Sequence, residues 1–104
     1  MNSFSTREIR HIFSVARRVV HHPGLDILIA PKSGPIARLL VVTPRRVGNA
    51  PERNKIRRRL KAIFHEEKLA QGILDCVVVV KVTGKELTFD ELKKLLVGAV
   101  KDGN

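Results

Sequence analysis

The stretch that decides the fold of this 104-residue chain is ILDCVVVVKV, at residues 73–82. Its unbroken apolar run, residues 76–80, is typical of a strand that is central in a sheet or covered on both faces, since a half-exposed strand alternates apolar and polar residues. On both sides of this strand, apolar residues recur every three or four positions, which is the pattern of amphipathic helices. The sequence therefore predicts a central sheet with helices packed on it.

Each helix next to this strand is predicted to begin with a capping box, in which the cap residue and the third helical residue exchange hydrogen bonds. Asn49 and Glu52 occupy these positions in the preceding helix, which we expect to end near Gly72. Thr88 and Glu91 occupy them in the following helix. The predicted buried stripes are Ile56, Leu60, Ile63 and Phe64 in the first of these helices, and Leu92, Leu95, Leu96, Ala99 and Val100 in the second.

The part of the chain before these helices is predicted to hold one more helix and a hairpin. Ser5 and Glu8 form another capping box, and the apolar stripe behind them predicts a helix that runs to Val20 and is closed by the sequence HHPG. The apolar runs 25–30 and 36–43, joined by PKSGP, predict two paired strands. A further short strand near residues 20–23 would enlarge the sheet.

The order of these elements predicts an α+β fold, an α/β sandwich of helix, strands, helix, strand and helix around a central sheet. The length fits one domain, residues 1–104. The single cysteine rules out an internal disulfide framework. No apolar run approaches the roughly 18 residues of a transmembrane helix, and the N-terminus has no signal-peptide core. We therefore expect a cytoplasmic protein with no membrane partner.

The chain carries a formal net charge of +10, and this charge is unevenly distributed. Residues 1–61 hold fourteen basic and three acidic side chains, a net of +11, whereas residues 62–104 have a net of −1. A concentrated positive region beside a nearly neutral one is typical of proteins that bind polyanions. Charge alone leaves histone-like, ribosomal and membrane-surface roles open. The lack of Trp and Tyr argues against a sheet that stacks bases on exposed aromatic residues.

Much of the positive charge lies in RRVGNAPERNKIRRRLK, residues 45–61, where Glu52 is the one acid. A solvated helix face usually mixes both signs of charge, whereas a bound phosphate backbone would offset the repulsion here and suits arginine. This pattern predicts nucleic-acid binding. Strands flank the helix on both sides, unlike a helix-turn-helix, which favours RNA over DNA. A helical projection places on the outward face Asn54, Arg57, Arg58 and Lys61.

Nothing in the sequence assembles a catalytic or metal site. The four histidines have no Cys, Asp or Glu partner at ligand spacing, and Cys76 lies inside an apolar run as a core residue. Glu66 and Glu67 are adjacent on a helix and cannot face one point. We therefore predict no catalytic residue and no metal ligand in this chain. Any catalysis in which it takes part must use groups that a partner supplies.

The motif RRVGNA at residues 45–50, followed by RNKIRRRL at residues 53–60, resembles the signature of the bacterial ribonuclease P protein subunit. That family shows a basic pair, then Gly-Asn-Ala, then a helix that opens Arg-Asn-Arg. The chain is also similar to the family in the Ile-Phe step at Phe13, in Asp75 before the apolar strand, and in the cap at Thr88. The resemblance covers nearly the whole chain.

The resemblance implies a fold like that of the second domain of a small-subunit ribosomal protein, with a left-handed βαβ crossover. It implies a free monomer that binds no DNA, and whose partners are the catalytic RNA of ribonuclease P and precursor tRNA. The holoenzyme is an endonuclease that removes the 5′ leader with Mg²⁺ held largely by the RNA. By position, the implied contacts are Arg45, Arg46, Arg53, Asn54, Lys55, Arg57, Arg58 and Lys61 for the catalytic RNA, and Phe13, Arg17 and Lys81 for a leader-binding cleft between the first helix and the sheet.

Four departures from the family pattern affect these expectations. Lys55 stands where the family usually has Arg, and Pro44 replaces a small hydroxyl residue or Gly before the basic pair. Ile9 replaces a common aromatic residue, and residues 25–30 lack the aromatic residue often found there. The alternative that remains is a ribosomal-type or general RNA-binding protein, which would bind unrelated structured RNAs equally well. A stand-alone nuclease would need acid and base groups that the sequence does not bring together.

Overall fold

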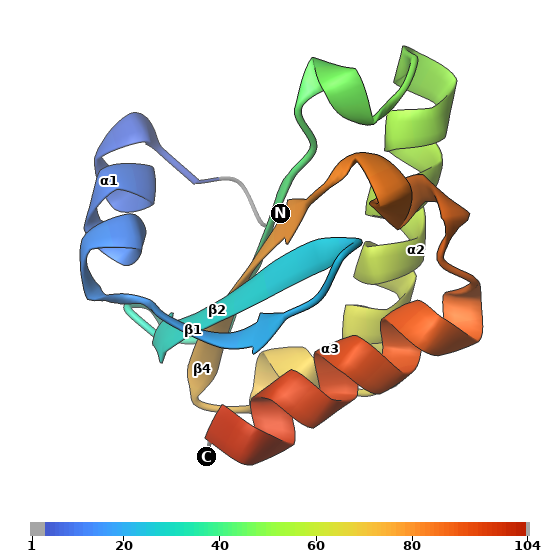
Figure 1. Ribbon diagram of the computed structural model, residues 1–104. Helices are drawn as coiled ribbons and strands as arrows, with labels where there is room; N and C mark the ends of the chain where they lie inside the picture. The colour runs from blue at the N-terminus through green and yellow to red at the C-terminus, as the bar shows by residue number, and fades with distance from the viewer. Residues whose placement is uncertain (1–3, 104) are drawn as a thin grey trace.

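The computed structural model describes residues 4–103 and places the apolar strand at the centre of a four-stranded sheet (Figure 1). β4 (Leu74–Val80) lies between β2 (Leu25–Pro31), to which it is antiparallel, and β3 (Leu39–Val42), to which it is parallel. β1 (Arg17–His21) is antiparallel to β2 and forms one edge, so the order is β1-β2-β4-β3. The prediction of a central strand is confirmed.

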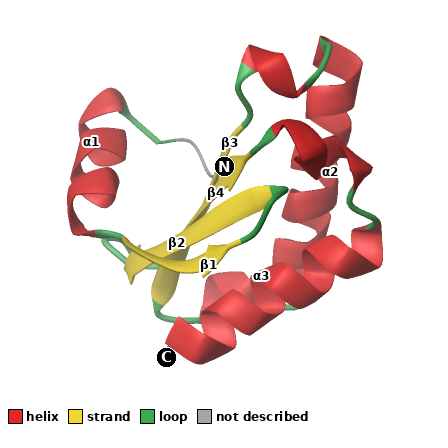
Figure 2. Cartoon of the chain, in the orientation of Figure 1, coloured by secondary structure: helices red, strands yellow, loops and turns green. Residues whose placement is uncertain are grey.

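Three helices pack on the sheet, and all three begin with the predicted capping boxes. α1 spans Thr6–Val15, α2 spans Ala50–Glu66 and α3 spans Phe89–Gly103. In each box the two residues exchange hydrogen bonds of 2.9–3.2 Å. Figure 2 shows α1 on one side of the sheet and α2 and α3 on the other. The described residues also form three short 3₁₀ turns: η1 (Arg45–Val47), η2 (Leu69–Gln71) and η3 (Val82–Glu86).

The two faces of the sheet are covered unequally. α2 and α3 pack their predicted stripes on one face, with Leu95 only partly buried, and form the main core with strand residues such as Ile27 and Val78. On the other face, the buried Ile12 of α1 packs with Ala30 and Val77. Because α1 has only ten residues, it covers one part of this face and leaves the rest partly exposed.

The predicted hairpin between residues 25–30 and 36–43 is wrong. β4 lies between these strands and pairs with β2 along its full length, and the hairpin joins β1 to β2 instead. The chain after β2 is tied to the residues before β4, for example by the Ala37 N–H, which donates to the Ala70 carbonyl at 3.0 Å. Local turn signals indicated the pairing, but the burial of the apolar β4 between two strands overrides them.

α1 is shorter than predicted, because it ends at Val15 and the chain then enters β1. Ala16 caps the helix with extended backbone, and its N–H donates to the Ile12 carbonyl at 2.8 Å. Val19 and Val20, assigned to the helix stripe from the sequence, pack against the main core from β1. A short strand, expected near residues 20–23, is therefore present as β1, and it both starts and ends earlier than expected.

α2 also ends before its predicted boundary, at Glu66 rather than near Gly72. Lys68 takes the left-handed backbone conformation, with φ of 55°, and its N–H donates to the His65 carbonyl at 3.1 Å. A left-handed residue just after the last turn is a common way to stop a helix. α2 thus connects the parallel neighbours β3 and β4 as a βαβ unit. The handedness of this unit stays a prediction.

Candidate RNA interface

One face of the sheet is only partly covered by α1. We call the uncovered part of this face the open face. It is formed by four half-buried side chains, Leu28, Leu40, Val42 and Val79. These side chains alternate along their strands with side chains of the main core, so the pleat of the sheet directs them to the side of α1. Phe13 of α1 is 42% exposed. The open face is therefore an apolar surface that solvent or a ligand can reach.

A hollow of about 320 Å³ connects the open face with α2. Its walls are formed by Phe4 just before α1, Ile9 of α1, residues 39–41 of β3, and Arg57 and Lys61 of α2. Ile9 and Phe13 are four residues apart and lie on the same side of α1. The predicted leader contact at Phe13 thus lies on the side of α1 that faces a hollow with basic residues on its far wall.

α2 presents the cations that the sequence predicts. Its buried stripe leaves Lys55, Arg58 and Lys61 exposed, while Arg53 and Arg57 are half-buried. Across residues 4–103, no ion pair joins any of these five cations to a carboxylate. The positive charge of this helix face is therefore left to attract an external anion.

The polar neighbours of this helix face orient its cations without neutralising them. Arg57 Nη1 donates to Asn54 Oδ1 at 3.2 Å, which links two of the predicted RNA contacts. Glu52 serves the helix cap, and its other oxygen lies 3.8 Å from Lys85 Nζ. Arg59 turns away and donates to a backbone carbonyl just before α3 at 3.3 Å.

Arg45 and Arg46 extend the positive surface to one end of the sheet. They lie in η1, which follows β3, and both are exposed while Val47 beside them is fully buried. β3 and β4 are parallel, so their C-terminal ends share one end of the sheet. Lys81 directly follows β4 at that end. The fold therefore brings together predicted contacts that are far apart in the sequence.

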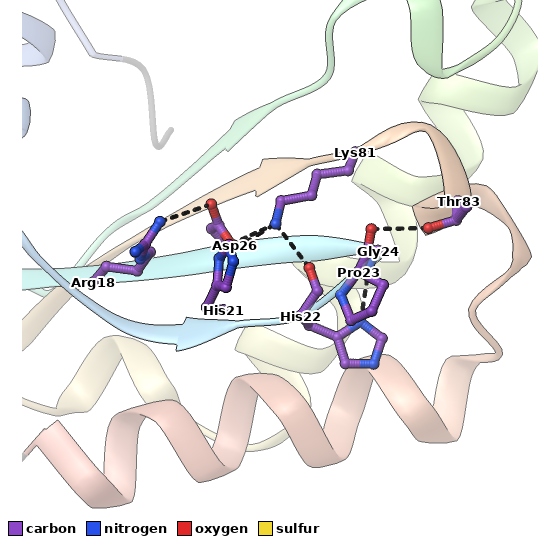
Figure 3. Close-up of polar contacts among 8 residues, drawn as sticks. All are labelled: Arg18, His21, His22, Pro23, Gly24, Asp26, Lys81 and Thr83. Atoms are coloured by element: carbon purple, nitrogen blue, oxygen red, sulfur yellow. Dashed lines mark hydrogen bonds and ion pairs between the residues drawn. The ribbon is translucent and has the colours of Figure 1, made fainter.

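A charged cluster of Arg18, His21, Asp26 and Lys81 lies at this end of the sheet (Figure 3). Asp26 Oδ1 is 2.8 Å from both His21 Nδ1 and Lys81 Nζ, and Asp26 Oδ2 is 3.7 Å from Arg18 Nη1. Lys81 Nζ also donates to the His22 carbonyl at 2.9 Å. Asp26 pairs in register with Val79, which places the cluster beside the open face.

The Asp26 carboxyl is charged at neutral pH. Partial burial acts to raise its pKa, but the hydrogen bonds from Lys81 and His21 outweigh this and hold the pKa below its ordinary value. A charged carboxylate only accepts hydrogen bonds, so His21 Nδ1 carries the hydrogen that it shares with Asp26. The cluster is thus held together by charge-assisted hydrogen bonds.

The structure does not bring Arg17 to Lys81. Arg17 pairs in register with Ile29, whose side chain is in the main core, and Arg17 Nη2 is 3.4 Å from the Gly103 carbonyl at the end of α3. Arg18 is the arginine that reaches the cluster with Lys81. Of the three residues predicted for the leader cleft, Phe13 and Lys81 are therefore on the side of α1, and Arg17 is directed to the side of α3.

Sequence reasoning missed Arg18, His21 and Asp26. The sequence predicted a helix through Val20, so Arg17 and Arg18 were assigned to a helix rather than to a strand. In a strand, neighbouring side chains point to opposite faces. A strand assignment from Arg17 onward would have separated Arg17 from Arg18 and directed attention to the second.

Residues 4–102 match the family model described as Ribonuclease P. The chain belongs to the ribonuclease P protein family. Over 61 residues it is 41% identical to the ribonuclease P protein component of Bacillus pumilus, which covers 57% of this chain and 50% of the relative. Over 83 residues it is 29% identical to the component of Halalkalibacterium halodurans, which covers 78% of this chain and 66% of the relative. The chain thus spans about half to two thirds of the curated relatives that it matches.

A solved structure shows the same fold. The RNase P protein of Staphylococcus aureus is similar with a TM-score of 0.80 at 19% identity, over 98% of this chain and 94% of that protein. This similarity confirms the predicted α+β fold, and the family match confirms the resemblance carried by the motif at residues 45–60.

Three further observations concern chemistry and location. No helix within residues 4–103 is long and apolar enough to cross a membrane. The same part of the chain contains no group of three or more His, Cys, Asp or Glu side chains that could hold a metal ion. Burial raises the pKa of the Cys76 thiol to about 12, so this thiol stays protonated and unreactive at neutral pH.

Proposed function

We propose that this protein is the RNA-binding subunit of a ribonuclease P holoenzyme. In this proposal α2 and η1 bind the catalytic RNA, and the open face with its charged cluster binds the single-stranded 5′ leader of precursor tRNA. The holoenzyme then cleaves the precursor endonucleolytically to give the mature 5′ end. The free protein acts as a monomer in the cytoplasm and binds no DNA.

The observation that supports this proposal is the adjacency of two different surfaces in a ribonuclease P fold. Among the described residues, the cations of the α2 face have no carboxylate partners, which suits the regularly spaced phosphates of a folded RNA. The open face is apolar with cations at its border, which suits a single strand, because unstacked bases pack on apolar side chains while their phosphates contact cations. The hollow beside β3 connects the two surfaces.

The chemical step is assigned to the RNA. The described residues contain no cluster that could hold a metal ion, so the proposal places the required Mg²⁺ with the RNA and derives no step through a metal site in the protein. The protein's part is to bind and orient. Its cations offset the repulsion between the phosphates of two RNA molecules, and its open face adds contacts to the leader.

The test is cleavage of a leader-bearing precursor tRNA by the cognate catalytic RNA at modest Mg²⁺ concentration, with and without the protein. We expect the protein to raise the cleavage rate and to lower the Mg²⁺ concentration that is needed. A variant with Arg58 and Lys61 changed to Gln should lose much of this stimulation. The matched control changes Lys94 and Lys101 of α3, two exposed cations outside the predicted RNA contacts, and should stimulate as wild type does.

Other outcomes would favour other functions. Equal affinity for unrelated structured RNAs, with no effect on leader removal, would identify a general RNA-binding protein. Cleavage of the precursor by the protein without RNA would identify a stand-alone nuclease. Either result contradicts the proposal.

A further inference from the structure

We propose that Asp26 is a positioning residue for RNA recognition. It holds the Lys81 ammonium in one place beside the open face, so that this cation favours a correctly placed leader over other RNA. The inference rests on the proposed function, because the cluster borders the surface to which we assign the leader.

An acidic residue at an RNA-binding surface is unfavourable on its own, because it repels phosphates. Asp26 nevertheless lies among three basic side chains at the border of the open face (Figure 3). Its side chain is 17% exposed, whereas those of Arg18 and His21 are 54% and 67% exposed. The carboxylate is therefore less accessible than the basic side chains around it, and it acts on them more directly than on a bound strand.

The contacts of Lys81 show what Asp26 does. An ammonium has three N–H groups, and two of them have acceptors here, Asp26 Oδ1 at 2.8 Å and the His22 carbonyl at 2.9 Å. His21 Nδ1 lies 3.4 Å from the ammonium, but it donates its own hydrogen to Asp26 and cannot accept a third bond. With these two acceptors among residues 4–103, the remaining N–H of Lys81 is left for a ligand.

Asp26 thus converts a mobile cation into a directed donor. A lysine side chain has four rotatable bonds and normally presents its charge in many positions. Here the side chain of Lys81 is 31% exposed and its end is held by two groups, from β2 and from the turn before it. A phosphate at the right place meets an oriented donor without the loss of side-chain freedom that binding would otherwise require.

The carboxylate has two opposite effects on RNA binding, and they can be separated. Its negative charge weakens the attraction of the protein surface for every phosphate. Its hydrogen bond to Lys81 strengthens only the contact with a leader that passes this point. The change Asp26→Asn removes the charge with little change in shape. We expect this variant to bind leaderless RNA equally well or more tightly, and to prefer leader-bearing RNA less.

The experiment uses the holoenzyme assembled from the protein and its cognate RNA. The dissociation constants for leader-bearing precursor tRNA and for mature tRNA without a leader are measured at fixed salt, and their ratio is the leader preference. We expect Asp26→Asn to lower this preference by about tenfold, the usual effect of a hydrogen bond to a charged group. Asp26→Glu keeps the charge and should retain more of the preference. Asp90→Asn, which removes an exposed charge from α3 on the other side of the sheet, should leave it unchanged.

A double-mutant cycle tests whether Asp26 acts through Lys81. The change Lys81→Gln should also lower the leader preference, and Asp26→Asn added to it should lower the preference no further, because the group that Asp26 positions is already gone. Full additivity of the two changes would overturn the positioning role. The Lys81→Gln variant also provides the comparison if Asp26→Asn reduces the folded fraction.

The outcomes distinguish this inference from the proposed function. An unchanged leader preference in Asp26→Asn, or an equal loss of affinity for both RNAs, would overturn the role of Asp26 and leave the proposed function standing. If the wild-type holoenzyme itself shows no leader preference and no stimulation of cleavage, the proposed function fails first.

Discussion

A direct test of α2 as an RNA-docking helix changes two of its exposed cations together, Arg58→Gln and Lys61→Gln. Both side chains are exposed on the face opposite the buried stripe, and within residues 4–103 neither forms an ion pair. Their replacement removes no core contact, so the free energy of unfolding should change by no more than about 0.5 kcal/mol. Any large effect on RNA binding then comes from the lost charges.

The size of the effect follows from counterion release. Each phosphate that a cation neutralises on a duplex contributes about 0.9 to the slope of log affinity against log salt concentration, so two lost contacts lower the slope by about 1.8. A rise from about 50 to about 200 mM salt is fourfold. Over this range the wild-type protein should therefore lose about 12-fold more affinity than the double variant.

The measurement is binding of the catalytic RNA at several salt concentrations, with thermal unfolding of each variant as a check on folding. The matched control, Lys94→Gln with Lys101→Gln, removes the same charge from exposed positions of α3. An unchanged slope in the α2 variant would refute the assignment of Arg58 and Lys61 to phosphate contacts. An equal change of slope in the control would show that net charge, rather than the α2 face, sets the affinity.

Three further changes test the scaffold that holds the two surfaces. Glu8 pairs with Arg38 at 2.7 Å, and the hydrogen bond from Arg38 lowers the pKa of this carboxyl from 4.5 to about 2. The contribution of the charged Glu8 to the free energy of unfolding should therefore be complete above pH 4.5 and lost as the pH falls toward 2. Acid unfolding of Glu8→Gln should lack this pH-dependent loss. Leu60→Ala should lower the free energy of unfolding by about 2–5 kcal/mol in denaturant titrations, because Leu60 is 0% exposed in the main core, and a loss below about 1 kcal/mol would contradict this packing. Gly84→Ala should destabilise the protein by about 1–3 kcal/mol in the same assay, since a Cβ there would overlap the Gly24 carbonyl, and an unaffected variant would show that the turn can shift.

The elements of the fold that sequence reasoning predicted well are those with local causes. The three capping boxes need only residues three positions apart, and the stripes of α2 and α3 need only a regular spacing, so both are visible in the sequence and present in the structure. The central strand was also predicted, because the run at residues 76–80 leaves no polar side to face solvent. The ends of α1 and α2 were misplaced, because strand pairing in one case and a left-handed residue at Lys68 in the other decide them.

The residues of the candidate site also fall into those that local sequence features predict and those that depend on tertiary structure. The positive face of α2 could be found from residues 53–61, since charge and helical spacing are both local properties. The cluster at Asp26 could not be found, because its members come from β1, β2 and the end of β4, and their meeting depends on strand order and register. The same dependence on strand register directs Arg17 toward α3 and Arg18 toward this cluster, while the leader contact predicted for Arg17 stays a prediction.

The sequence by itself determined that this protein is a basic α+β domain with a concentrated positive helix, and its motif indicated the ribonuclease P family to which it belongs. The tertiary structure alone decided that β4 separates β2 from β3, that α1 leaves an apolar face open, and that Asp26 holds Lys81 beside it. The physical reason is that helix caps and stripes form between close neighbours in the chain. A strand finds its partners at any sequence distance, and only the burial of the whole sheet selects among them.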